Sequence, residues 1–160
     1  MLKNVIVDIA HAKVSTQPDE MLVTYSLGSC LGVVFYDTEL HIGAMAHCML
    51  PLSSIDTSKA TEKPYMFVDV GIPRLLEEMF QLGCRKRNLV TRVAGGASAI
   101  SNTNLFRIGE RNFAVFRKIM WKNGLLIQGE DVGGEITRTL RLETATGRLT
   151  VRSNGVEREL

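Results

Sequence analysis

Cys30 and His47 are the residues of this 160-residue chain whose types and spacing suggest covalent chemistry. Residues 31–36 and 41–50 favour two strands joined by a turn, which makes them a candidate antiparallel hairpin. If the turn is centred between Thr38 and Glu39, Cys30 faces His47, with Cβ atoms about 4.5–5.5 Å apart. A thiol beside an imidazole can give up its proton and attack a carbonyl carbon.

The same register separates the hairpin into two faces. One face collects only apolar side chains and is expected to be buried: Leu31, Val33, Phe35, Ile42, Ala44 and Ala46. The other face carries Cys30 and His47 with Gly32, Gly43 and Met45, and its glycines are expected to leave room for a substrate side chain. A slip of one residue would place the thiol and the imidazole on opposite faces.

Residues just before Cys30 could complete such a site. Gly28 permits a tight turn, after which the backbone amides of Ser29 and Cys30 could donate to a developing oxyanion. Thr24 or Ser26 could accept a hydrogen bond from the second imidazole nitrogen and so set its tautomer.

Other interpretations of these residues stay open. Cysteine is common in protein cores as a small apolar side chain, and Cys48 and Cys84 are interpreted in that way. A zinc site built from Cys30, His41, His47 and Cys48 lacks the paired spacing typical of such sites, and Cys48 is expected to point away from the others.

The elements that must position these residues indicate an α+β fold in one domain, residues 1–160. The apolar spacing of Ile72, Leu75, Leu76, Met79 and Phe80 predicts a helix that ends near Gly83, and residues 113–120 predict a second one before Gly124. Strands are expected at 5–10, 21–26, 31–36, 41–50, 88–94, 125–129, 137–143 and 148–152, with a polar loop at 53–63. Because helices and strands do not alternate strictly, a layered arrangement is expected.

Composition excludes several classes of protein. The net charge of +2 is too small to indicate a nucleic-acid-binding surface. The basic run at 85–87 follows a predicted helix, and cations are favoured near a helix C-terminus. No apolar run approaches the ~20 residues needed to cross a bilayer, and the N-terminus lacks signal-peptide features, so a cytoplasmic protein is expected. Three irregularly spaced cysteines argue against a disulfide framework.

Five ordered motifs carry a resemblance to a known family. They are L-G-S-C-L-G-V at 27–33, I-G-A-M-A-H-C-M-L-P at 42–51, Gly95-Gly96-Ala97, I-G-E-R-N at 108–112 and E-D-V-G-G at 130–134. Together the chain resembles the CheD family of chemoreceptor glutamine deamidases from about residue 21 to residue 152.

The resemblance implies a catalytic triad of Cys30, His47 and Thr24 in a layered α/β/β sandwich similar to deamidating toxins. It implies hydrolysis of receptor glutamine side chains to glutamate, with neither a metal nor an organic cofactor. It also implies two partners: the chemoreceptor cytoplasmic domain as substrate and a CheC-type phosphatase, expected to dock near Gly95, Gly96 and Ala97.

Two alternatives accompany this assignment. The chain could be mainly a non-catalytic regulatory partner of a CheC-type CheY phosphatase, or a receptor glutamyl methylesterase. It also departs from the family pattern at Ala99, often a bulky apolar residue, and at Thr137, often glycine. These departures affect the expected shape of nearby loops but leave the triad intact.

Overall fold

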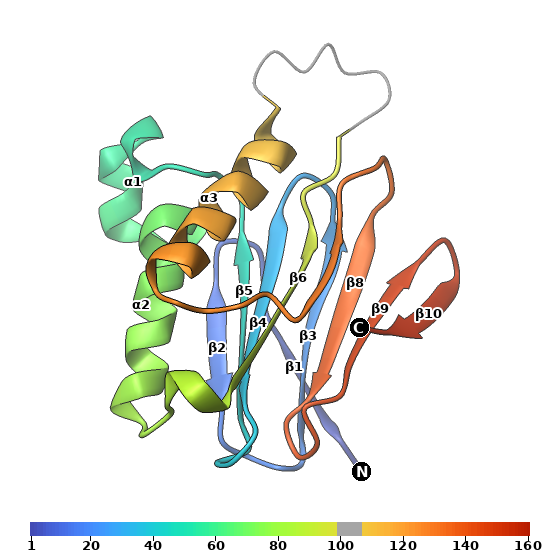
Figure 1. Cartoon of the computed structure of the whole chain (residues 1–160). Coiled ribbons are helices and arrows are strands. Elements are labelled where there is room, and N and C mark those ends of the chain that lie inside the picture. Colours follow the sequence, from blue (N-terminus) through green and yellow to red (C-terminus); the bar gives the residue numbers. More distant parts are fainter. Residues whose placement is uncertain (99–106) are drawn as a thin grey trace.

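The computed structural model describes residues 1–98 and 107–160 (Figure 1). Ten strands and three α-helices are formed by the described residues: β1 (Lys3–Ile6), β2 (Ala12–Ser15), β3 (Glu20–Leu27), β4 (Leu31–Asp37), β5 (Ile42–Cys48), α1 (Thr57–Glu62), α2 (Val68–Gln81), β6 (Leu89–Gly95), α3 (Ile108–Lys122), β7 (Gly129–Val132), β8 (Arg138–Glu143), β9 (Leu149–Ser153) and β10 (Val156–Glu159). No helix in these ranges is both long and apolar enough to cross a bilayer.

The strands form two five-stranded mixed sheets, in the orders β1-β3-β8-β9-β10 and β2-β5-β4-β6-β7. Helices α2 and α3 cover the outer face of the second sheet, while its inner face meets the first sheet (Figure 1). The predicted α+β class and its α/β/β layering are therefore confirmed. The two predicted main helices are α2 and α3.

Each helix of the outer layer buries the apolar stripe that its sequence spacing predicted. Ile72, Leu75 and Met79 of α2 and Phe116 and Met120 of α3 are fully or almost fully buried in one core with the outer face of β4 and β5. Both helices are thereby held on the sheet by apolar burial, worth about 25 cal/mol per Å². This contact places the first turn of α3 beside the end of β5.

Some elements differ from the sequence prediction. The expected polar loop at 53–63 contains α1, which has no buried residue and is capped by the Asp56 side chain accepting from the Lys59 N–H. The expected strand at 125–129 is wrong, because the Leu125 N–H closes the end of α3 on the Met120 carbonyl, and β7 begins only at Gly129. Two short strands, β2 and β10, were not predicted.

The register of the β4–β5 hairpin differs from the prediction by two residues. Gly32, not Cys30, lies opposite His47, and Leu31 lies opposite Cys48. The turn is shifted because the Asp37 side chain accepts from the N–H groups of the two residues that follow Thr38, which extends β4 by one residue. A shift of two preserves the faces, and all six predicted apolar residues lie in the core beneath the helices.

The opposite face of the hairpin is not open to a substrate. A Cβ added to Gly32 would lie 2.7 Å from Leu27 Cδ1 and 2.8 Å from Leu140 Cδ1. A Cβ on Gly43 would lie 2.9 Å from Leu142 Cδ2. The expectation that these glycines leave room for a glutamine is therefore wrong, because leucines of the other sheet fill that space.

We predict that Gly32→Ala destabilises the protein by about 1–3 kcal/mol, since the new methyl group overpacks the space between the sheets. Gly28→Ala is the matched control, because nothing lies within 4 Å of its added Cβ. The free energy of unfolding in urea should change by less than about 0.5 kcal/mol for the control. Equal effects of the two substitutions would contradict this packing.

Candidate active site

His47 lies near the end of β5, between the two sheets, and only 1% of its surface is exposed. Its backbone is bonded to the segment that joins β1 to β2: the His47 N–H donates to the His11 carbonyl at 3.0 Å and the His47 carbonyl accepts from the Ala10 N–H at 2.9 Å. The imidazole is thus fixed on a rigid strand rather than on a loop.

Thr24 sets the tautomer of this imidazole. Its hydroxyl donates to the Val7 carbonyl at 2.6 Å and lies 2.7 Å from His47 Nδ1. A hydroxyl has one proton, so the Thr24 oxygen must accept from Nδ1–H. The neutral ring therefore carries its proton on Nδ1 and a lone pair on Nε2. The prediction that Thr24 accepts a hydrogen bond from the imidazole is confirmed.

His47 Nε2 is buried and has no hydrogen-bond partner among the described residues. Burial lowers the pKa of His47 to about 4, against a smaller upward effect of the Asp8 carboxylate. At neutral pH the ring is therefore uncharged, with an unpaired basic nitrogen. Its free lone pair can accept a proton from a neighbouring thiol, although the lowered pKa makes it a weaker base than an exposed histidine.

Cys30 lies in the three-residue segment between β3 and β4, where it is half-buried and packs against the apolar cluster between the sheets. It precedes Gly32, the residue opposite His47, by two positions, so it is a diagonal neighbour of the histidine rather than directly opposed. Diagonal neighbours in an antiparallel pair are about 7–8 Å apart, within reach of long side chains.

The three thiols differ in environment. Burial raises the pKa of the Cys30 thiol, although its own backbone N–H opposes this effect. Complete burial raises the pKa of Cys48 to about 12, and burial beside Asp37 raises that of Cys84 to about 11. Cys48 and Cys84 lie in the core beneath the helices, as expected, and Cys30 alone is partly accessible.

Each backbone carbonyl of the Cys30 segment is held by a donor from elsewhere. The Gly28 carbonyl accepts from Ala97 N–H and the Cys30 carbonyl from Gly96 N–H, both at 2.9 Å, while the Ser29 carbonyl accepts from the Asn112 side chain. No backbone carbonyl of the described residues accepts from Ser29 N–H or Cys30 N–H. Among the described residues these two amides, predicted as oxyanion donors, therefore have no backbone acceptor, although the Cys30 N–H lies against its own thiol.

Gly95, Gly96 and Ala97 are buried, so the prediction that they form a substrate or partner surface gains no support. A Cβ on Gly95 would collide with the Cys30 carbonyl, which explains why glycine is needed at this close approach. Arg138, next to the departure at Thr137, donates to the Gly95 carbonyl at 3.3 Å and pairs with Asp131. Ala99 lies outside the described residues.

The end of β3 carries an irregularity next to these groups. The register with β8 shifts between Thr24 and Leu27, and Ser26 has a φ of 57°. A positive φ costs energy in residues other than glycine and is common near functional sites. The sequence allowed either Thr24 or Ser26 to bind His47. Ser26 is exposed, and Thr24 makes the bond.

The zinc alternative finds no support in the described ranges, which contain no group of three His, Cys, Asp or Glu side chains able to hold a metal ion. His41 lies at the turn of the hairpin, where its Nδ1 is 2.9 Å from the Tyr36 hydroxyl. Cys48 belongs to the core beneath the helices, on the other face of the sheet.

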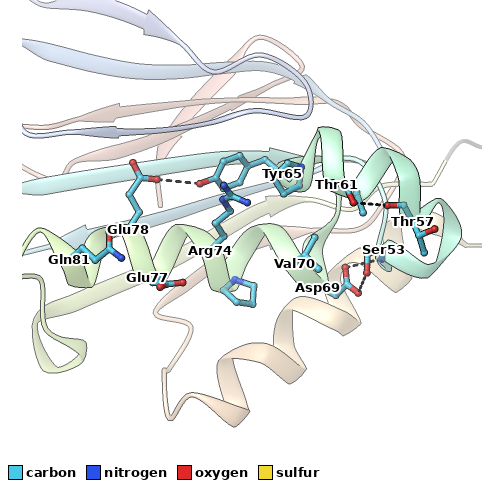
Figure 2. A pocket seen from close by; sticks show the side chains of 13 residues that line it. Ser53, Thr57, Thr61, Tyr65, Asp69, Val70, Arg74, Glu77, Glu78 and Gln81 are labelled. Carbon is cyan, nitrogen blue, oxygen red and sulfur yellow. Dashed lines mark hydrogen bonds between the residues drawn. The ribbon is translucent and has the colours of Figure 1, made fainter.

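An open pocket of about 1020 Å³ lies elsewhere, between α1 and α2 (Figure 2). Its lining includes Tyr65, Arg74 and Glu78, with the Tyr65 hydroxyl donating to Glu78 at 3.2 Å. Asp69 is already bonded to Ser53, and neither cysteine nor histidine contributes to the lining. The pocket therefore lacks a thiol–imidazole pair.

Three contributors to the site have no local signal in the sequence. Val7 and His11 bind the Thr24 hydroxyl and the His47 backbone, and Asn112 binds the Ser29 carbonyl. Only Asn112 stands in a motif that the sequence singled out, I-G-E-R-N. That motif carried part of the family resemblance but indicated no role for its asparagine.

The fold and site define an α/β/β sandwich with a thiol, an imidazole and a hydroxyl gathered where β3 ends and β4 begins. The chain belongs to the CheD chemotactic sensory transduction family, whose characteristic sequence pattern it matches over residues 49–153. Thr24, Cys30 and His47 precede the matched stretch. Similarity to individual relatives, however, extends over almost the whole chain.

The relatives are named as probable chemoreceptor glutamine deamidases. The one from Solibacter usitatus is 46% identical over 159 residues, which cover 99% of this chain and 94% of the relative. CheD 1 of Syntrophus aciditrophicus is 47% identical over 152 residues, 95% of each chain. The protein from Caldanaerobacter subterraneus is 37% identical over 152 residues, covering 93% of this chain and 92% of the relative.

We predict that Thr24→Val lowers the free energy of unfolding by about 1–3 kcal/mol, because it leaves both His47 Nδ1–H and the Val7 carbonyl without their buried partner. Thr91→Val is the matched control: Thr91 is also fully buried, but its hydroxyl has no partner among the described residues. This control should be neutral or stabilising in urea denaturation. A Thr24→Val protein as stable as the control would contradict the hydrogen-bond assignment.

Proposed function

We propose that this protein is a cysteine-dependent amidohydrolase that converts glutamine side chains of chemoreceptors to glutamate, with Cys30 as nucleophile, His47 as base and Thr24 as the group that orients the base. The observation that carries the proposal is the buried His47 ring, with Nδ1–H held by Thr24 and Nε2 without a partner among the described residues. The partly accessible Cys30 lies two residues from Gly32, which is opposite His47. Family membership and the names of the relatives supply the substrate.

The protonation states favour general-base catalysis over a preformed ion pair. Burial raises the pKa of Cys30 and lowers that of His47, so both groups are neutral at rest. As Sγ attacks the carboxamide carbon, its proton moves to Nε2 and negative charge develops on the substrate oxygen. The amides of Ser29 and Cys30, which have no backbone acceptor among the described residues, are the donors proposed to stabilise this oxyanion.

The imidazolium then returns a proton to the departing nitrogen, so ammonia leaves and a thioester remains. Water attacks the thioester while Nε2 accepts its proton, and the collapsing intermediate releases glutamate as Sγ is reprotonated. Each turnover consumes one water, releases one ammonia and adds one negative charge to the receptor. Every proton transfer uses Nε2, which explains why the other ring nitrogen is tied to Thr24.

The enzyme is favoured over the non-catalytic alternative because a binding module has no need of a buried imidazole with an unpaired nitrogen. Ester hydrolysis would use the same groups, so the methylesterase activity stays an alternative for the substrate assay to decide. A CheC-type phosphatase partner stays a prediction from the family resemblance. We place the protein in the cytoplasm, where it would meet the cytoplasmic domain of its receptor.

We predict that Cys30→Ala lowers deamidation at least ~10³-fold, because the covalent route is lost. The assay is mass spectrometry of a receptor cytoplasmic fragment before and after incubation, in which each converted glutamine adds about one dalton. The control is Cys84→Ala, which removes a buried thiol outside the site and should retain activity. A folded Cys30→Ala protein with full activity would rule out the proposed mechanism.

We also predict that the acid limb of kcat/KM lies near pH 4 rather than near the ordinary histidine value of about 6.5. The base works only when unprotonated. Since its pKa is lowered in the folded protein, activity should persist below pH 6 and be lost as pH falls through about 4. Circular dichroism at each pH separates this loss from acid unfolding. An acid limb centred at pH 6.5 in the folded protein would show that His47 is not the base, or is not desolvated.

A further inference from the structure

The side chain of Asn112 joins the two strand ends that carry the candidate catalytic pair. It lies in the first turns of α3 and is completely buried. Its Nδ2 donates to the Ser29 carbonyl at 2.9 Å and to the Met49 carbonyl at 3.0 Å. Ser29 immediately precedes Cys30, and Met49 follows His47 by two residues.

The orientation of this amide follows from its neighbours. Both backbone groups beside it are acceptors, so only the NH₂ end can face them, and an NH₂ group has two protons to give. The other end, Oδ1, is buried without a partner among the described residues. A buried acceptor without a partner is destabilising. Among the described residues, the side-chain amide of Asn112 thus makes its hydrogen bonds only through its NH₂ end.

These two bonds lie beyond the residues that the pairing of β4 and β5 holds together. Paired residues of β4 and β5 begin at Leu31 and end at Cys48, so Cys30 and Met49 both lie beyond the ladder. The Gly28 and Cys30 carbonyls are tied to the end of β6, but among the donors described only Asn112 bonds both to the Cys30 segment and to the residues that follow β5. Loss of this link would leave the distance between thiol and imidazole less well defined.

We propose that Asn112 is a positioning residue that fixes Cys30 relative to His47 by binding the backbone on both sides. This inference rests on the proposed function for its kinetic consequence, but its geometric part concerns only the reactivity of Cys30. Asn112 touches no reacting atom. Its effect is exerted through the Ser29 and Met49 carbonyls.

The test uses Asn112→Leu, which has nearly the same shape but no donor. Asn123→Leu is the matched control, because Asn123 lies at the other end of α3 and donates its side-chain amide to the Ile119 carbonyl at 2.8 Å. Iodoacetamide labelling of Cys30 is followed by intact mass from pH 5 to pH 10, with Cys30→Ala as background. Deamidation of the receptor fragment gives kcat and KM separately.

For Asn112→Leu we expect the ratio of labelling rates at pH 7 and pH 10 to fall about tenfold, because the thiol loses assistance from His47 but still ionises at high pH. We expect kcat to fall at least about tenfold with KM changed less than twofold. Asn112→Ser, which retains one donor, should fall between Asn112→Leu and the wild type. Asn123→Leu should keep the wild-type labelling profile and kcat even where its melting temperature drops.

A labelling profile and kcat for Asn112→Leu equal to those of Asn123→Leu would overturn the proposal. Failure of both Asn112 variants to fold, with Asn123→Leu folded, would also overturn it, since Asn112 would then be required for stability. If the wild type labels at Cys30 but deamidates no receptor, the proposed function falls. The labelling comparison still decides the role of Asn112 in that case.

Discussion

Burial of the β4–β5 hairpin on both of its faces is the constraint on which the rest of the structure depends. All seven residues of β4 and all seven of β5 are buried. Leu31, Val33 and Phe35 of β4 lie in the core beneath α2 and α3, and Val34 and Tyr36 lie in the cluster between the sheets. A hairpin covered in this way must be apolar or fully bonded at nearly every position. Buried Asp37 accepts from three N–H groups, whereas His47 Nε2 has no partner among the described residues.

This burial determines the chemistry that the site can perform. Desolvation keeps the imidazole neutral and the thiol protonated, so a resting thiolate–imidazolium pair is disfavoured. The Thr24 hydroxyl compensates one ring nitrogen and leaves the other unpaired. The same packing that stabilises the sandwich therefore keeps His47, the proposed base, unprotonated down to about pH 4.

Much of this arrangement could be predicted from the sequence, and the errors have a physical origin. Alternation along 31–36 and 42–46 identified the faces of the hairpin correctly, because side chains alternate strictly in a strand. The register was wrong by two residues because it depended on the turn, where the Asp37 side chain binds two amides and His41 adopts a φ of 56°. Neither feature is visible in the apolar pattern.

The expectation that Gly32 leaves room for a substrate side chain was wrong for a different reason. A single strand pattern indicates which residues share a face but not what packs against that face, and here Leu140, more than a hundred residues later in the chain, fills the space. The bond between Thr24 and His47 was predicted because Thr24 lies shortly before Cys30 in the sequence and occupies the threonine position of the family triad. The contacts of Asn112 depend on the docking of α3, because this residue is 83 positions from Ser29. They could not be predicted from the sequence.

The location of the candidate site follows from backbone hydrogen bonding. Inside a sheet each central strand commits its N–H and C=O groups to neighbouring strands, so few amides are left for a substrate. Ser29 and Cys30 lie between the last residue of β3 and the first of β4, beyond both ladders. There the carbonyls accept from Ala97, Asn112 and Gly96, whereas the two amides have no backbone acceptor among the described residues. The segment between β3 and β4 is thus held by three donors from other parts of the chain. It carries both a fixed thiol and the N–H groups that an oxyanion requires.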